Sequence, residues 1–342
     1  MRRVIIRKAG GYDRLELVTS PDPTPEEDEV VVRTQACGVN YADCVVRMGL
    51  YSSAAKYVGW PITPGFEVAG EVVAVGPKVR DVRVGAPVMA VTRFGGYATH
   101  VKVPRRQVFE RPEGFTVEQA AAFPSVFLTA WYALSELANV RAGMRVLVHS
   151  AAGGVGGAMC QLLRVKGCKA VGVVGRTDKV EEARKQGAEV VIDKSREDLW
   201  RMAKRAAPDG YDVVCDANGV ATLKESWEHL RSPGRLVVYG FHTMLGHRGT
   251  PSLPRLAVDW ARTPRFSPFE MTETNRSVLA FNLSYLFDEL DLLTGGLDEL
   301  LGWVREKKLT PQPVRTFPLD RVADAHRLIE SGATVGKLVL VP

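Results

Sequence analysis

A glycine-rich turn after an apolar strand constrains the fold of this 342-residue chain more than any other feature. The strand is Val146-Leu147-Val148-His149, and the turn Ser150-Ala151-Ala152-Gly153-Gly154-Val155-Gly156-Gly157 leads into an apolar helix predicted over 156–166. Glycines at such a turn allow a tight bend and let the backbone approach a pyrophosphate closely. The first turn of the helix offers free N–H groups and the positive end of its dipole. The pattern predicts a dinucleotide site with contacts from Ala152, Gly153, Gly154, Val155 and Gly156.

Strands and helices alternate on the C-terminal side of this turn. Strands are predicted at 170–174, 190–192, 212–215 and 235–239, and helices at 178–186, 197–206 and 222–230 separate them. Strands that are apolar on both faces and are joined by helices are typical of a parallel sheet covered on both sides. We therefore predict an α/β fold with a doubly wound parallel sheet over 123–285.

The first 122 residues have a different character. They are rich in valine, glycine and proline, with strand-like runs at 29–34, 68–75 and 84–91 that turn residues separate. This pattern is typical of a β-barrel. The last part of the chain, 286–342, ends in a helix followed by an apolar strand, and we expect it to return to this N-terminal domain. Between the two lies 241–276, a proline- and arginine-containing stretch predicted to be a long loop whose ordering on ligand binding the sequence leaves open.

Composition excludes several classes of protein. The 45 Lys+Arg and 39 Asp+Glu residues give a net charge of +6, but the basic residues are scattered, so we expect no nucleic-acid partner. No apolar stretch approaches the ~20 residues that span a bilayer, so no integral membrane contact is expected. The five cysteines are an odd number without a C-x-x-C pair, which favours a reducing, cytoplasmic location.

The end of the second predicted strand indicates which dinucleotide binds. It reads Val173-Val174-Gly175-Arg176-Thr177-Asp178-Lys179, with no acid at the tip to accept hydrogen bonds from ribose hydroxyls. Gly175 leaves room, and Arg176 and Lys179 carry the charge that a 2′-phosphate favours. The prediction is NADPH. The alternative is that Arg176 and Lys179 are solvated residues at a helix start, with Asp178 as the N-cap.

Several motifs along the whole chain resemble those of the medium-chain dehydrogenases/reductases. They are Gly65-Phe66-Glu67-Val68-Ala69-Gly70-Glu71-Val72, Gly95-Gly96-Tyr97-Ala98, Ala120-Ala121-Ala122-Phe123-Pro124, Asn282-Leu283 and Gly336-Lys337. Within that family they are most similar to the quinone oxidoreductases and the vesicle amine transport protein homologues. The pair Gly85-Ala86 departs from the usual Gly-Asp. The resemblance implies a GroES-like β-barrel catalytic domain beside a Rossmann domain.

The resemblance also predicts whether this chain binds zinc. Zinc-dependent relatives carry a cysteine where this chain has Asn40 and a histidine where it has Phe66. Asparagine is a poor zinc ligand and phenylalanine is none. Cys37 and Cys44 are seven residues apart with no histidine nearby, so a structural zinc is not expected either. We therefore expect no metal site.

Without a Lewis acid, the resemblance implies a reductase that transfers hydride from NADPH to a quinone or an α,β-unsaturated carbonyl. The candidate catalytic donors are Asn40, Tyr41 and Tyr51, because an amide and phenols donate hydrogen bonds to a developing enolate. In the alternative, Asn40 only caps a helix and Tyr41 is a core residue.

Further cofactor contacts are assigned through the resemblance. Lys194 stands where quinone oxidoreductases carry a tyrosine that contacts the 2′-phosphate. Gly332 replaces a C-terminal arginine of some relatives, and Lys337 is expected to substitute for it unless it is a solvated residue at a strand edge. The remaining contacts assigned to the cofactor are Gly240, Phe241 and Asn282.

Two other functions stay open at this point. An enoyl-thioester reductase would need a basic groove, for which Arg262, Arg265 and Arg276 are candidates. An NADPH-binding protein with little turnover, vesicle- or RNA-associated as in some relatives, is the second alternative. In either case we expect a homodimer that pairs through the edge strand near Val278–Phe281.

Overall fold

The structure, a computed structural model, describes residues 1–245, 249–250 and 252–342. Two compact units make up this part of the chain. The first contains Met1–Val126 and Ser284–Pro342 together with Gly249 and Thr250, and the second contains the described residues of 127–283 other than those two. The domain boundaries expected from the sequence fall at 122/123 and 285/286, within four residues of these divisions.

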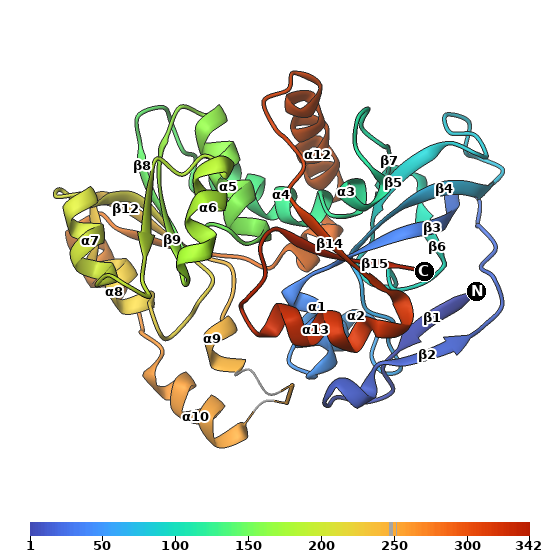
Figure 1. The fold of residues 1–342 in the computed structure, drawn as a ribbon, viewed down its shortest axis with the longest axis horizontal. Helices are drawn as coiled ribbons and strands as arrows, with labels where there is room; N and C mark the ends of the chain where they lie inside the picture. Colours follow the sequence, from blue (N-terminus) through green and yellow to red (C-terminus); the bar gives the residue numbers. More distant parts are fainter. Residues whose placement is uncertain (246–248, 251) are drawn as a thin grey trace. The chain divides into compact units, whose positions relative to one another are not determined.

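A seven-stranded, largely antiparallel sheet forms the centre of the first unit (Figure 1). Its strands run in the order β14-β15-β3-β4-β5-β7, and β6 also pairs with β3. The strands are β3 (Glu29–Val39), β4 (Glu67–Val75), β5 (Pro87–Val91), β6 (His100–Pro104), β7 (Val108–Glu110), β14 (Val314–Pro318) and β15 (Lys337–Val341). Val30, Val32, Val68 and Val88 are buried in its core, as the alternating runs predicted. A small separate sheet pairs β1 (Arg2–Ile5) with β2 (Glu16–Thr19).

The end of the chain lies in this N-terminal sheet. Strand β15 runs antiparallel to β3, with Leu338 opposite Val39. Figure 1 shows β15 beside β3. The helices of the unit are α1 (Tyr41–Arg47), α2 (Ser52–Tyr57), α3 (Val117–Ala121), α12 (Leu290–Arg305) and α13 (Val322–Glu330), with short 3₁₀ turns that include η1 (Tyr12–Arg14) and η5 (Leu283–Asp288).

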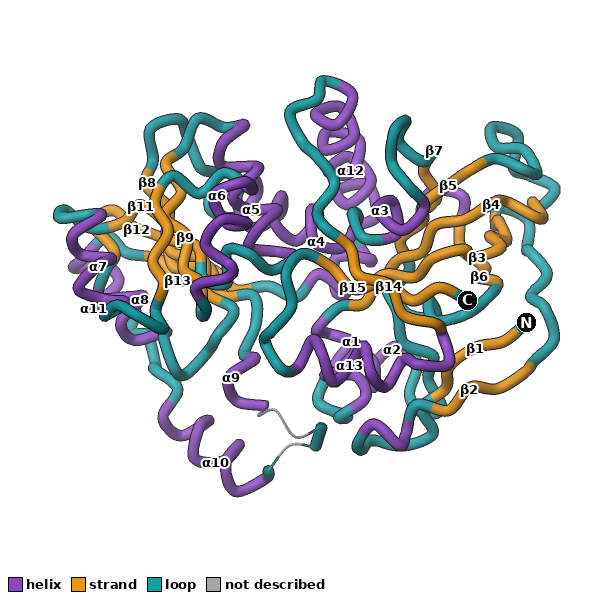
Figure 2. Tube along the Cα trace, in the orientation of Figure 1, coloured by secondary structure: helices purple, strands orange, loops and turns teal. Residues whose placement is uncertain are grey.

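The second unit contains a six-stranded sheet in which every pairing is parallel. The order is β10-β9-β8-β11-β12-β13. The strands are β8 (Arg145–Val148), β9 (Lys169–Val174), β10 (Val190–Asp193), β11 (Tyr211–Asp216), β12 (Leu230–Val238) and β13 (Ser277–Ala280). The helices that join them are α5 (Gly154–Val165), α6 (Val180–Gln186), α7 (Leu199–Ala206) and α8 (Leu223–Glu228). Figure 2 shows α5 and α6 on one face of the sheet and α7 and α8 on the other. The predicted doubly wound sheet is confirmed.

One predicted boundary and one predicted segment need correction. Strand β12 begins at Leu230, five residues before the predicted 235, because Leu230 already pairs with Tyr211 before a register shift. The stretch 241–276 contains the helices α9 (His242–Leu245), α10 (Leu253–Arg262) and α11 (Pro268–Thr274), where a loop was expected. Pro254 and Pro268 did not prevent this, because they lie in the first turns of α10 and α11, where a missing N–H costs no hydrogen bond, and Pro264 lies between the two helices. Residues 246–248 and 251 of this stretch lie outside the described residues.

No described helix combines the length and the apolarity needed to cross a membrane.

A fully buried ion pair joins α1 to α13 in the first unit. The guanidinium of Arg47 pairs with the carboxylate of Glu330, and both side chains are wholly inaccessible. The same guanidinium donates to the carbonyl oxygen of Gly249 at 2.8 Å. The Tyr12 hydroxyl donates to Glu330 at 2.7 Å. These bonds compensate the cost of burying two charges, and the loss of either partner would leave the other uncompensated.

Replacing Arg47 should therefore destabilise the protein strongly. We expect Arg47→Met to lower the free energy of unfolding by about 3–5 kcal/mol, because the buried Glu330 carboxylate would lose the cation that compensates its charge. The matched control is Arg33→Met, which breaks the exposed Arg33–Glu71 pair on β3 and β4 and should cost less than about 1 kcal/mol. Urea denaturation of both variants measures the difference, and equal losses would contradict this account.

Candidate active site

Asn40 lies at the junction of β3 and α1 in the first unit. It is the N-cap of α1, and its backbone N–H donates to Asp43 Oδ2 at 2.8 Å. Asp43 is itself held by the backbone N–H of Gly65 at 2.8 Å and the hydroxyl of Tyr97 at 3.0 Å. Burial raises the pKa of Asp43 to about 7, although these donors favour the carboxylate. The alternative that Asn40 caps the helix is thus correct for its backbone, and its side chain is used elsewhere.

The side-chain amide of Asn40 joins a buried ion pair. The ammonium of Lys337 donates to Glu67 Oε1 at 2.7 Å, to Asn40 Oδ1 at 2.7 Å and to the carbonyl oxygen of Val39 at 3.0 Å. Asn40 Nδ2 donates to Glu67 Oε1 at 2.9 Å. The side chain of Lys337 is 3% exposed and that of Glu67 is fully buried. The alternative that Lys337 is a solvated residue at a strand edge is therefore wrong.

The carboxylate of Glu67 is fixed on its other side as well. Its Oε2 accepts a hydrogen bond from the backbone N–H of Ser125 at 2.7 Å. A Cβ atom on Gly38 would lie 2.3 Å from Glu67 Oε1 and 2.4 Å from the carbonyl oxygen of Ala121. Only glycine at position 38 therefore lets β3 pass so close to this carboxylate.

Aromatic side chains gather near Tyr51 in the same unit. The ring of Tyr51 meets Phe66 edge-on at a centroid distance of 5.9 Å and Phe94 at 6.4 Å, and Phe66 lies 5.2 Å from Phe94. Phe66 thus packs as an apolar core residue in a cluster with Ile6, Val46 and Ile62. Tyr41, the first residue of α1, is half-buried, and burial raises its phenol pKa, so the hydroxyl keeps its proton as a donor.

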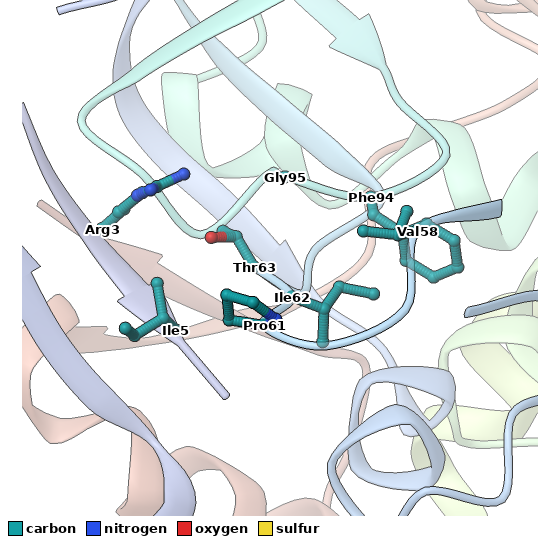
Figure 3. Close-up of a pocket in the computed structure, with 8 residues that line it drawn as sticks. All are labelled: Arg3, Ile5, Val58, Pro61, Ile62, Thr63, Phe94 and Gly95. Atoms are coloured by element: carbon teal, nitrogen blue, oxygen red, sulfur yellow. The ribbon is translucent and has the colours of Figure 1, made fainter. Parts of the chain in front are cut away.

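A hollow of about 280 Å³ opens on the first unit beside this cluster (Figure 3). The residues that line it are Arg3, Ile5, Val58, Pro61, Ile62, Thr63, Phe94 and Gly95. Phe94 belongs to both the hollow and the aromatic cluster. None of Asn40, Tyr41 and Tyr51 is among the lining residues, so the hollow is not assigned to the predicted site.

In the second unit, the glycine-rich turn joins β8 to α5 as predicted. Gly153 is the N-cap of α5, and the N–H of Ala151 donates to the carbonyl oxygen of Val173 at 3.0 Å, which fastens the turn to β9. A Cβ on Gly156 would lie 2.3 Å from the carbonyl oxygen of Ser150, so helix and turn could not pack with a larger residue there. A Cβ on Gly153 would meet only that oxygen, at 3.3 Å. The backbone at the start of the twelve-residue helix is therefore open to a ligand on the side of Gly153.

Positively charged side chains surround the end of β9. A Cβ on Gly175 would meet only Lys194 Cε, at 3.5 Å, which leaves the room that the sequence predicted. Lys179 is 9% exposed, and burial together with the neighbouring Arg176 lowers its pKa. Arg176 forms two hydrogen bonds to Asp178, at 3.0 and 2.9 Å. The alternative that Asp178 is the N-cap of the next helix is wrong, because α6 begins at Val180 with Lys179 as its cap.

Sequence reasoning missed two residues at this end of the sheet, Asp193 and Arg196. Asp193 ends β10, and its oxygens accept from the Ser195 N–H at 2.9 Å, the Ser195 hydroxyl at 2.6 Å and the Thr177 hydroxyl at 2.5 Å. Hydrogen bonds from Ser195 and Thr177 lower its pKa, so it stays charged. Arg196 Nε donates to the Thr177 hydroxyl at 2.8 Å. The Asp193 carboxylate at the tip of β10 therefore already has partners in its own loop and in the loop after β9, and Arg196 adds a fourth cation to Arg176, Lys179 and Lys194.

The loops after β11, β12 and β13 carry the remaining predicted contacts. Asp216 ends β11 and holds its loop by accepting from the N–H of Asn218 at 2.8 Å and the hydroxyl of Thr222 at 2.7 Å. Gly240 packs against Ala217 of this loop, Phe241 is exposed, and Asn282 follows β13. Because all six strands are parallel, these loops meet the glycine turn and the β9 tip at one edge of the sheet.

Among the described residues, only Cys44, His326 and Glu330 are grouped closely enough to hold a metal ion. The group does not fit a metal. Arg47 and Tyr12 already occupy the Glu330 carboxylate, and a cation would have to enter beside the Arg47 guanidinium. Burial lowers the pKa of His326 to about 3 and raises that of the Cys44 thiol.

Known proteins resemble this chain over its whole length. Residues 26–113 match the alcohol dehydrogenase GroES-like domain, and residues 186–340 match the zinc-binding dehydrogenase domain. The human synaptic vesicle membrane protein VAT-1 homolog is 34% identical over 344 residues, which cover 100% of this chain and 86% of that protein. A probable quinone oxidoreductase of Schizosaccharomyces pombe is 33% identical over 340 residues, 99% of this chain and 96% of that protein. The chain belongs to the medium-chain dehydrogenase/reductase family.

A solved structure agrees with this assignment. The crystal structure of Escherichia coli quinone oxidoreductase complexed with NADPH matches with a TM-score of 0.85 and 28% identity, over 100% of both chains. The expected resemblance is thus confirmed, and so is the fold class, a GroES-like domain with a Rossmann-type parallel sheet. The family is one of oxidoreductases, and the E. coli member binds NADPH.

Proposed function

We propose that this protein is a zinc-independent reductase that transfers hydride from NADPH to a quinone or an α,β-unsaturated carbonyl. The observation that carries the proposal is the set of cations at the β9 tip, where the nearby carboxylates of Asp178 and Asp193 are both taken by neighbouring side chains. The matches to quinone oxidoreductases support the reaction class.

The residues of the second unit fit NADPH. The open backbone at Gly153 and the start of α5 would bind the pyrophosphate, together with Ala152, Gly154, Val155 and Gly156. Arg176, Lys179 and Lys194 would hold the 2′-phosphate, and Gly175 leaves space for it. Gly240, Phe241 and Asn282 would complete the site on the loops after β12 and β13. When bound, NADPH supplies the hydride.

The first unit supplies the groups that act on the acceptor. Asn40 Nδ2 uses one N–H on Glu67, which leaves the other to donate to an acceptor carbonyl as it becomes an enolate. Tyr41 and Tyr51 are additional donors. The rings of Phe66 and Phe94 exclude water beside Tyr51.

Zinc independence rests on the two positions that would bear zinc ligands. Asn40 holds the Lys337–Glu67 pair with its amide, and Phe66 is packed in an aromatic cluster. Neither is suited to bind zinc. Quinones and enones accept hydride with less electrophilic help than the direct oxidation of an alcohol requires, so the proposed acceptors match a site without a metal.

We also propose a cytoplasmic homodimer. β13 lies at the edge of the six-stranded sheet, and an unpaired edge of this kind favours pairing with a second copy. A molecular mass of twice the 37.5 kDa of the chain, measured by sedimentation, would support the dimer, and a monomer at micromolar concentration would contradict it.

Removing the cations should change the preference between the two dinucleotides. We expect Arg176→Ala/Lys179→Ala to weaken NADPH binding on the order of 10–100-fold and to leave NADH binding nearly unchanged, since only NADPH carries the 2′-phosphate. The control is Arg184→Ala, which removes an exposed arginine of α6 that pairs with Glu181. Calorimetric titration measures both constants, and equal losses for the two cofactors would mean that the phosphate binds elsewhere.

A screen of acceptors tests the reaction itself. We expect NADPH oxidation with ortho-quinones or simple enones. Turnover restricted to crotonyl-thioesters would identify an enoyl-thioester reductase instead. Of the arginines that this alternative needs, Arg265 lies over the ring of Trp260 and Arg276 over that of Trp227. Tight NADPH binding without any turnover would favour a binding protein of the vesicle- or RNA-associated kind.

A further inference from the structure

We infer that Lys337 and Glu67 are positioning residues that fix the Asn40 amide in the one orientation in which it can donate to the acceptor. The inference rests on the proposed hydride transfer and assigns Lys337 a role different from the cofactor contact that the sequence suggested. An ammonium has three hydrogens, and three oxygens take them: Val39 O, Asn40 Oδ1 and Glu67 Oε1. No donor of Lys337 is left for a phosphate.

The two charges determine which end of the amide faces which partner. In the observed orientation Asn40 Oδ1 faces the ammonium of Lys337 and Nδ2 faces the carboxylate of Glu67. Rotating the amide by half a turn would bring its N–H groups against the ammonium and its oxygen against the carboxylate. That rotation would break two charge-assisted hydrogen bonds and create two repulsions in a buried site. Asn40 is therefore held as a donor toward the acceptor and not as an oxygen.

The ammonium also makes that donor stronger. A hydrogen bond to Asn40 Oδ1 from a cation draws electron density from the amide nitrogen, so its remaining N–H becomes a better donor. Oriented donors of this kind act on the charge that develops in a transition state. Lys337 thus affects the reaction through Asn40 without touching the acceptor.

The backbone around the pair is built to keep it in place. Lys337 is the first residue of β15, whose next residue pairs with Val39, so its ammonium reaches the end of β3. The preceding Gly336 has a φ of +62°, and a Cβ there would lie 2.1 Å from the carbonyl oxygen of Pro313. The Ser125 N–H holds Oε2, the other oxygen of the Glu67 carboxylate, and Gly38 leaves the space that Oε1 occupies. All of these contacts lie within the first unit.

The test compares three substitutions in the full-length protein. With saturating NADPH and a simple enone, Lys337→Met should lower the single-turnover rate of hydride transfer by about 10–100-fold, the effect expected for an impaired oxyanion donor. The Kd for NADPH should stay the same. Lys337→Arg should recover most of the rate, because it keeps the cation. Lys224→Met, which removes an exposed lysine of α8, is the matched control and should change nothing.

A double mutant separates an action through Asn40 from a general structural role. Asn40→Ala and Asn40→Ala/Lys337→Met should be equally slow, because Lys337 has nothing left to orient. If the rate losses of the two single mutants multiply in the double mutant, the inference is overturned. A raised Kd for NADPH with an unchanged rate at saturation would also overturn it, since Lys337 would then be a cofactor ligand.

A second readout keeps the inference testable if no acceptor turns over, in which case the proposed function fails by itself. In protein labelled with ¹⁵N-asparagine, the side-chain amide hydrogens of Asn40 should exchange slowly with solvent in the wild type and in Lys337→Arg. They should exchange faster in Lys337→Met. If Lys337→Met does not fold, Glu67→Gln removes the other partner and should have the same effect. If the Asn40 amide hydrogens exchange at the same rate in all of these variants as in the wild type, the positioning role is refuted.

Discussion

The buried pair of Lys337 and Glu67 is the interaction on which the proposed catalytic arrangement depends. Two opposite charges removed from water are tolerated only when every donor and acceptor has a partner, and here Val39, Asn40 and Ser125 provide those partners. The pair also explains why β15, the last strand of the chain, must lie against β3 and why position 38 is glycine. Asn40 is thereby oriented by Lys337, which is 297 positions away in sequence, and by Glu67, which is 27 positions away.

In the second unit, positively charged side chains gather at one edge of the parallel sheet. The glycine turn opens the start of α5 to a diphosphate, and four cations, Arg176, Lys179, Lys194 and Arg196, lie on the neighbouring loops. The acids among them are satisfied locally, Asp178 by Arg176 and Asp193 by Ser195 and Thr177. Under the proposed function, this arrangement favours a dinucleotide with an additional phosphate over one that needs a free carboxylate for its ribose.

The sequence predicted the local features well, but it did not indicate which distant residues form buried ion pairs. The glycine turn and the alternation of strands and helices have periodicities that local sequence encodes, so the parallel sheet was found with boundaries mostly within two residues. The Lys337–Glu67 and Arg47–Glu330 pairs join residues 270 and 283 positions apart, and nothing in either neighbourhood indicates the partner. From the sequence alone, Lys337 is therefore predicted to be a cofactor ligand or, in the alternative, a solvated residue at a strand edge. The helices in 241–276 were missed because prolines in the first turn of a helix look the same in sequence as prolines in a loop.

The account's central claim is hydride transfer from NADPH without a metal, and metal content measured on an active sample tests it most directly. The protein should be treated with a chelator, analysed for zinc by mass spectrometry and then assayed for NADPH oxidation with an ortho-quinone. The account predicts an undiminished rate with no stoichiometric zinc. A rate that falls with chelation and returns when zinc is added would contradict it.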